Sequence, residues 1–216
     1  MVEIDIRRAI DLQKKLSEKV LLELNSFRSI ELNKVKYVVG VDAAYNRDLM
    51  VGVAVAIDFE NRHLLTYSVV KKKTPMNYIP GLLAFREAPA YIAAIKKLPI
   101  RPDVIFVDGH GLSHPRALGI ATHIGLVLDK PTVGIAKKRL YGEIVEDRGK
   151  KYVIAHGHRV AQIIVHKGKE LYVSIGYKIS LESAVRITVY LLDQKHKLPL
   201  PIALADNLSK RLAKRP

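Results

Sequence analysis

The chain has 216 residues and a mass of 24.2 kDa, which suits a single domain. Its 36 lysines and arginines against 21 acidic residues give a formal net charge of +15, which is typical of proteins that bind nucleic acid. The absence of cysteine excludes disulfide scaffolds, thiol nucleophiles and cysteine-based metal sites. The longest apolar run, Leu49–Ile57, is too short to span a membrane, and the charged N-terminus does not resemble a signal peptide. We therefore expect a cytoplasmic protein, and a monomer.

The first part of the chain predicts a helix followed by an antiparallel meander. Residues 4–24 carry apolar side chains at near-helical spacing, namely Ile6, Ile10, Leu16, Val20 and Leu24. Three strand-like runs follow with short connections: Tyr37–Tyr45, Leu49–Asp58 and Leu64–Val70. The second run alternates, with Val51, Val53, Val55 and Ile57 on one face and Gly52, Ala54 and Ala56 on the other.

The second part of the chain alternates helices and strands. Pro80–Leu98 has helical spacing, although Pro89 either kinks this helix or begins a second one. The remaining elements are strands at Val104–Val107 and Pro131–Ala136, a helix at Gly119–Leu128 between them, β-hairpins over 151–179, a helix capped by Ser180, and a short helix leading into a basic tail that includes Arg215. Three antiparallel strands followed by alternating helices and strands is the order of the ribonuclease H-like fold. We expect one α/β domain over residues 1–216, built on a mixed sheet with flanking helices.

Three carboxylates are the main candidates for chemistry. Asp42 lies inside the apolar first strand, where an ionised group is costly unless a cation pairs with it. Asp108 ends a buried strand, at the edge where α/β proteins bind ligands, and Glu87 falls on the apolar face of its helix. Each also has an ordinary explanation, as an edge residue, a helix cap or a surface ion pair. Together, in a basic protein, they favour a Mg²⁺ site for phosphodiester cleavage.

Further residues near these carboxylates extend the pattern. Lys137 follows the strand TVGIA and would place a fixed positive charge near a phosphate, although the run KKR also fits a solvated surface. Three histidines surround the Asp108 loop, and one of them is a candidate phosphate contact: His110, His114 and His123. Tyr78 and Ile79 precede a Pro80-Gly81 turn, where they either form an exposed wedge for a base stack or pack on the core.

Long segments of the chain resemble endonuclease V. They are NYIPGLLAFREAP, VIFVDGHGLSHPRALGIATHIGL and PTVGIAKKRLYG, and GVDAAY matches the first catalytic strand of that family. The resemblance covers roughly residues 37–142 and implies a ribonuclease H-like nuclease that uses Mg²⁺, or Mn²⁺ in its place. It implies a substrate of single- or double-stranded DNA with a deaminated base, chiefly deoxyinosine. Cleavage is expected at the second phosphodiester bond 3′ to the lesion, leaving a 3′-hydroxyl and a 5′-phosphate.

The resemblance also implies a role for individual residues. Asp42, Asp108 and Glu87 would be metal ligands, Glu87 directly or through a water, and Lys137 would complete the catalytic set by supporting the phosphate. The wedge would be formed by Tyr78, Ile79 and Pro80. The pocket for the flipped base is expected at Gly81, Leu83, Gly109, Gly111, Ile120 and Leu140.

Two positions depart from the family pattern. Asn77 precedes Tyr78 where the family usually has proline. Asp206 stands where bacterial members carry a histidine near the metals, and a carboxylate serves there as a ligand but not as an imidazolium donor. Three alternatives stay open: an inosine-specific endoribonuclease, a structure-specific nuclease such as a ribonuclease H or junction resolvase, and a non-catalytic nucleic-acid binder.

Overall fold

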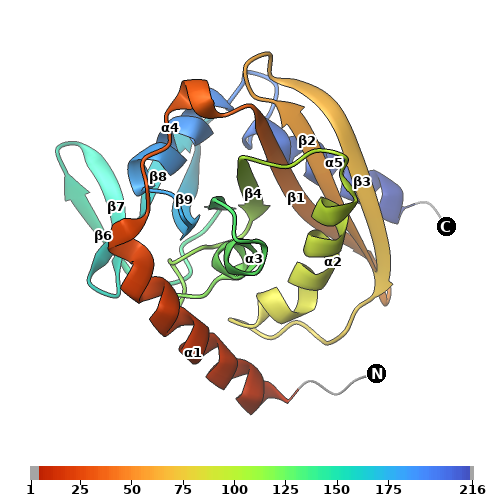
Figure 1. Ribbon diagram of the computed structural model, residues 1–216, viewed down its shortest axis with the longest axis horizontal. Helices are drawn as coiled ribbons and strands as arrows, with labels where there is room; N and C mark the ends of the chain where they lie inside the picture. The colour runs from red at the N-terminus through yellow and green to blue at the C-terminus, as the bar shows by residue number, and fades with distance from the viewer. Residues whose placement is uncertain (1–4, 215–216) are drawn as a thin grey trace.

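A single mixed sheet runs through the middle of the molecule (Figure 1). The computed structural model describes residues 5–214, so residue 4 of the predicted first helix and Arg215 of the predicted basic tail lie outside the described residues. The strands are β1 (Tyr37–Asn46), β2 (Leu49–Asp58), β3 (His63–Lys73), β4 (Val104–Asp108), β5 (Thr132–Ala136), β6 (Glu143–Asp147), β7 (Lys150–Ala155), β8 (His158–His166) and β9 (Lys169–Tyr177). The helices are α1 (Ile6–Glu23), α2 (Leu83–Lys97), α3 (Ile120–Leu128), α4 (Leu181–Tyr190) and α5 (Leu200–Ala213), with short 3₁₀ turns at Leu24–Ser26 and Leu32–Lys34. Of the helices described, none is long and apolar enough to cross a membrane.

The strand order is β3-β2-β1-β4-β5-β9-β8-β7-β6. The first three strands form the predicted antiparallel meander, and β1 then pairs in parallel with β4, which pairs in parallel with β5. In the β1–β4 ladder Val41 lies opposite Val107, so the residues that follow them, Asp42 and Asp108, emerge side by side. The predicted mixed α/β sheet is therefore confirmed, and its register brings two of the candidate carboxylates together.

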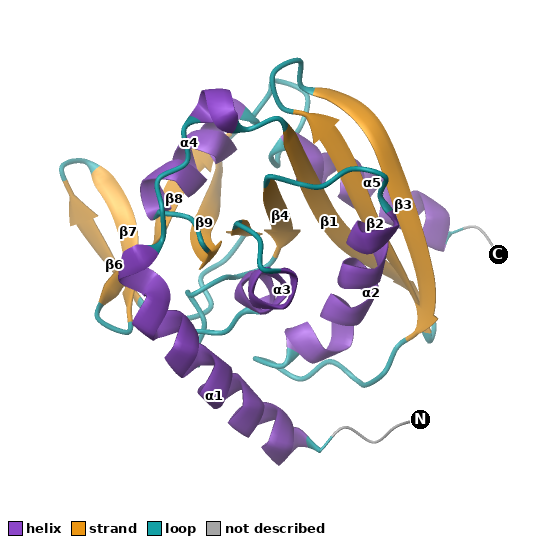
Figure 2. Ribbon diagram, in the orientation of Figure 1, coloured by secondary structure: helices purple, strands orange, loops and turns teal. Residues whose placement is uncertain are grey.

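Helices cover both faces of the sheet (Figure 2). One core lies between the sheet and α4 with α5, a second lies between the sheet and α2 with α3, and α1 packs over β7, β8 and β9. The central strands are apolar almost throughout because both of their faces are buried. In β2 the valines and Ile57 belong to the α5 side and the alanines to the α2 side, as the alternation predicted.

The structure differs from the sequence-based expectations at four places. The last helix, expected to be short, is the 14-residue α5, which includes part of the expected basic tail. The second helix begins at Leu83 and is continuous. Pro89 lies inside it and does not begin another helix. Ile6, expected on the buried face of α1, is 46% exposed, because the first turns of that helix extend beyond the sheet (Figure 1). The strand β6 was not predicted.

A close contact between α5 and β1 fixes the position of the last helix. A Cβ atom at Gly40 would lie 2.3 Å from the backbone carbonyl carbon and oxygen of Pro201, in the first turn of α5. Glycine therefore lets the helix rest directly on the backbone of the strand. The next turns of α5 then pass over Asp42, two residues further along β1.

Candidate active site

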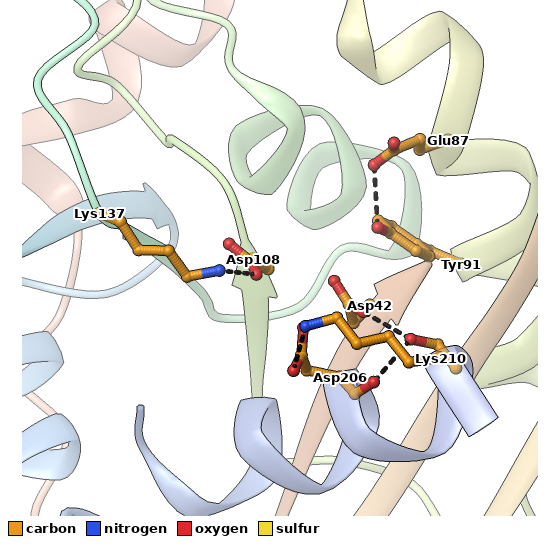
Figure 3. Close-up of polar contacts among 8 residues, drawn as sticks. Asp42, Glu87, Tyr91, Asp108, Lys137, Asp206 and Lys210 are labelled. Atoms are coloured by element: carbon orange, nitrogen blue, oxygen red, sulfur yellow. Dashed lines mark hydrogen bonds and ion pairs between the residues drawn. The ribbon is translucent and has the colours of Figure 1, made fainter. Parts of the chain in front are cut away.

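Three carboxylates meet where β1, β4 and α5 converge (Figure 3). Asp42, Asp108 and Asp206 each place an oxygen atom within 4.8 Å of those of the other two. Asp42 is buried, at 7% exposure, and the other two are half-buried. The parallel register of β1 and β4 explains the first two positions, and the contact of α5 with Gly40 explains the third.

The environment of Asp42 disfavours its charged form. Burial raises the pKa of this carboxyl to about 7, and the neighbouring charge of Asp108 acts in the same direction. The Ser209 hydroxyl donates a hydrogen bond of 2.7 Å to Asp42 Oδ2, which opposes the rise in pKa without cancelling it. The site therefore favours a proton or a cation next to Asp42.

Two lysines pair with the other two carboxylates. Lys137 Nζ lies 2.8 Å from Asp108 Oδ2, as the sequence led us to expect of a lysine near the site. Burial lowers the pKa of Lys137, but the charge and hydrogen bond of Asp108, together with the charges of Asp206 and Asp42, outweigh it, so the net shift of the pKa is upward. Lys210 Nζ lies 2.7 Å from Asp206 Oδ1, one helical turn further along α5. These ammonium groups offset part of the negative charge of the cluster, and neither of them forms an ion pair with Asp42.

Glu87 occupies a different position from the three aspartates. It reaches the site from α2, on the opposite face of the sheet from α5 (Figure 3). Its Oε1 accepts a hydrogen bond from the Tyr45 hydroxyl and its Oε2 one of 2.9 Å from the Tyr91 hydroxyl. Burial raises the pKa of Glu87, and both hydrogen bonds oppose that rise. The structure does not bring Glu87 into the group of three, so its role as a ligand stays a prediction.

The donor set fits a hard divalent cation. Carboxylate oxygens are the ligands that Mg²⁺ prefers, and the cluster contains only these. Burial first, and the neighbouring carboxylates second, raise the pKa of Asp42, so an ionised carboxylate is costly at this position when no such ion is near it. A bound cation would remove that cost, so the residues present are suited to hold one.

A pocket of about 230 Å³ opens beside the carboxylates. Five of the six residues expected around a flipped base line it: Gly81, Leu83, Gly109, Ile120 and Leu140. The sixth, Gly111, packs against β9, where a Cβ atom would lie 1.9 Å from the carbonyl oxygen of Ile175. Tyr78 stands at the pocket with 60% of its surface exposed, so the tyrosine is not tucked onto the core.

Three donors converge on one carbonyl at the wall of this pocket. The carbonyl oxygen of Gly81, a residue with φ of +79°, accepts hydrogen bonds from Gln13 Nε2 at 3.0 Å, Arg116 Nη2 at 2.8 Å and His114 Nε2 at 3.1 Å. Arg116 Nε also donates to Gln13 Oε1 at 2.6 Å. The helix α1, which carries the fully buried Gln13, thereby fixes the backbone immediately after the Tyr78–Pro80 segment.

The three histidines near the Asp108 loop are uncharged at neutral pH. Burial lowers the pKa of His114 to about 4, and it lowers the pKa of His110 and His123 as well. His114 Nδ1 accepts from the backbone N–H of Arg116 while Nε2 donates to Gly81, which is the pattern of a neutral ring. His110 lines the pocket, and His123 packs edge-on against Phe85. None of them offers a cation to a phosphate.

Comparison with known proteins identifies the family. The family profile described as Endonuclease V matches residues 14–207. The chain belongs to the endonuclease V family. The endonuclease V of Desulfurococcus amylolyticus is 54% identical over 207 residues, which cover 95% of this chain and 94% of that one.

Solved structures of the endonuclease V family share the fold. The crystal structure from Streptomyces avermitilis superposes with a TM-score of 0.86 at 31% identity, covering 98% of this chain and 94% of that chain. The Ciona intestinalis endonuclease V, solved with a 23mer DNA containing an inosine followed by a ribo-adenosine, gives a TM-score of 0.83 at 27% identity and covers 97% of both chains. These similarities confirm the ribonuclease H-like fold, and family membership makes the protein a nuclease.

Proposed function

We propose that the protein is a DNA repair endonuclease that recognises deaminated bases, chiefly hypoxanthine in deoxyinosine. With Mg²⁺ it hydrolyses the second phosphodiester bond 3′ to the lesion and leaves a 3′-hydroxyl and a 5′-phosphate. The observation that carries this proposal is the position of the base-sized pocket directly beside the three-carboxylate cluster. The inosine-containing DNA bound by the Ciona intestinalis relative supports the choice of base.

The cation would be held by Asp42, Asp108 and Asp206, with Glu87 contributing directly or through a water. Mg²⁺ in this site supplies Lewis acidity to the scissile phosphate, and Mn²⁺ has the same preference for oxygen ligands. Lys137 keeps a positive charge beside Asp108, where it stabilises the charge that develops on the phosphate. Asp206 takes a ligand role at the position of the bacterial histidine and does not donate a proton from an imidazolium.

Base recognition requires the nucleotide to leave the stack. The exposed Tyr78, with Ile79 and Pro80, inserts into the stack as a wedge while the base enters the adjacent pocket. Replacing Tyr78 by alanine is expected to slow nicking of duplex DNA more than nicking of single strands, whose bases are already unpaired. An equal effect on both substrates would contradict the wedge.

A cleavage assay tests the proposal. Labelled strands with one deoxyinosine, and matched deoxyadenosine strands, are incubated with Mg²⁺, with EDTA, and with the Asp42→Ala protein. We expect a single nick one nucleotide beyond the lesion that needs both the metal and Asp42. Equal cutting of deoxyadenosine strands would remove the base specificity, and faster cutting of undamaged hybrids or junctions would indicate a structure-specific nuclease. Binding without cleavage in any divalent metal would indicate a non-catalytic binder.

An inosine-specific endoribonuclease is the second candidate function. The DNA bound to the Ciona intestinalis relative carries a ribo-adenosine after the inosine, so a ribonucleotide is present next to the modified base in that complex. The ratio of nicking rates on inosine RNA and deoxyinosine DNA chooses between the two substrates. We retain the expectation of a cytoplasmic monomer. A sedimentation measurement of the free protein tests whether it is a monomer.

A further inference from the structure

A second cleft, of about 480 Å³, borders the acidic cluster at Asp206. Its walls are the end of β5, the start of β9, and α5 with the loop before it. Five of the lining residues are lysines: Lys137, Lys138, Lys169, Lys197 and Lys210. We refer to it as the lysine cleft.

The lysine cleft carries a surplus of positive charge. Lys137 and Lys210 are paired with carboxylates of the acidic cluster. Within the part of the chain that the structure describes, Lys138, Lys169 and Lys197 form no ion pair, and all three are exposed. Apart from Asp206, the one acidic lining residue is Glu170, which lies 3.8 Å from a lysine outside the cleft. The cleft is therefore suited to a polyanion.

Contacts between its two walls hold the lysine cleft in shape. Beside it, His166 Nε2 donates to the carbonyl oxygen of His196 at 2.9 Å, and Lys167 Nζ donates to that of Gln194. These bonds tie the β8–β9 turn to the loop before α5. Because one wall carries Lys169 and the other Lys197, the two ammonium groups are presented from a preformed frame.

The base pocket and the lysine cleft form one track. Lys138 lines both of them, Gly109 next to Asp108 lines the pocket, and Asp206 of the acidic cluster lines the cleft. Figure 3 shows Lys137 and Lys210, which both line the cleft, beside Asp108 and Asp206. A strand with its base in the pocket and its scissile phosphate at the carboxylates can continue along this track into the cleft.

We propose that the lysine cleft binds the backbone phosphates of the nucleic-acid strand on the 3′ side of the cleaved bond. The direction rests on the proposed function, because that function places the cleaved bond 3′ to the base in the pocket. Lysine contacts to phosphates are independent of sequence and fix the position of the strand. Binding here would hold the part of the strand that carries the new 5′-phosphate.

The test measures binding in EDTA, where cleavage does not occur. The double variant Lys169→Ala/Lys197→Ala is compared with wild type on deoxyinosine single strands that have a long 3′ extension or none. Loss of two phosphate contacts is expected to reduce the slope of log Kd against log salt by about 1.4 on the extended strand. The strand without the extension is expected to bind both proteins equally.

The matched control is Lys96→Ala/Lys97→Ala, which removes the same charge from the last turn of α2, at the end that leads to the amino end of β4. An equal change in this control, equal loss on both strands, or dependence on a 5′ extension instead would each overturn the proposal. Failure of the proposed function looks different: wild type would bind deoxyinosine and deoxyadenosine strands alike. The salt slope on an undamaged strand would then still decide whether the cleft binds phosphates.

Discussion

Replacing Asp42 by asparagine is expected to stabilise the metal-free protein while removing a cation ligand. Burial and the charge of Asp108 raise the pKa of Asp42 from 3.8 to about 7. At about 1.4 kcal/mol for each tenfold change in proton affinity, the ionised carboxylate costs up to about 4 kcal/mol at pH 8. Asparagine keeps an oxygen that accepts from Ser209 and loses the charge. If local relaxation reduces the cost of the ionised carboxylate to about half, the unfolding temperature of the Asp42→Asn variant is expected to lie about 4 to 8 °C above that of wild type.

The pH dependence fixes the sign of this effect. Unfolded Asp42 loses its proton near pH 3.8 and the folded residue near pH 7, so the folded state binds the extra proton between these values. The stability of the metal-free protein therefore falls as the pH rises through this window, and the variant lacks this contribution to the fall. Thermal unfolding in EDTA at pH 5 and pH 8, followed by circular dichroism, measures the difference. Added Mg²⁺ is expected to raise the unfolding temperature of wild type more than that of the variant.

Asp58 provides a control, because its pKa is shifted in the opposite direction from that of Asp42. The pKa of Asp58 is lowered, chiefly by a hydrogen bond from the backbone N–H of Asn61, so Asp58→Asn is expected to give no gain at pH 8. The reasoning is refuted if Asp42→Asn unfolds at a lower temperature than wild type in EDTA at pH 8. It is also refuted if the gain is as large at pH 5 as at pH 8.

Three further substitutions test the supports of the site. Ser209→Ala removes the hydrogen bond to Asp42 and is expected to raise the Mg²⁺ concentration for half-maximal nicking by about 10- to 100-fold, measured by metal titration. Gln13→Ala removes buried hydrogen bonds at the pocket wall and is expected to cost about 1 to 3 kcal/mol of unfolding free energy in denaturant titrations. Gly40→Ala places a Cβ atom against Pro201 and is expected to cost about 1 to 3 kcal/mol and to weaken Mg²⁺ binding, because α5 is displaced; unchanged metal affinity would contradict this.

The order of elements was predictable because the buried strands are continuous apolar runs and Ser180 caps its helix, accepting from the N–H of Ser183. The position of β9 between β5 and β8 was not predictable, because a hairpin pattern in the sequence does not determine which other strand each of its strands pairs with. The strand β6 escaped prediction for a physical reason. Its two apolar residues, Ile144 and Val145, are both exposed, so the segment has no buried face to produce a period of two.

The site was predictable in part. Asp42 and Asp108 stood out because carboxylates within or at the end of apolar strands are costly, and Asp206 came from a departure in a family pattern. Ser209 and Lys210 follow Asp206 at helical spacings of three and four. Predicting the full length of this helix would have placed them on the same face as Asp206. Other supports depend on tertiary contacts alone. The bonds of Gln13 to Gly81 and to Leu118 join segments 68 and 105 residues away in the sequence.

The acidic cluster is completed only late in the synthesis of the chain. Asp42 lies on β1, whereas Asp206 and Ser209 lie on α5, the last element that the structure describes, and the Ser209–Asp42 hydrogen bond joins residues 167 positions apart. A growing chain on the ribosome can therefore form the meander and the parallel strands while one carboxylate is still missing. The proposed cation site is complete only when α5 docks on Gly40. A partly synthesised chain thus lacks the complete site while it is still next to the messenger that encodes it.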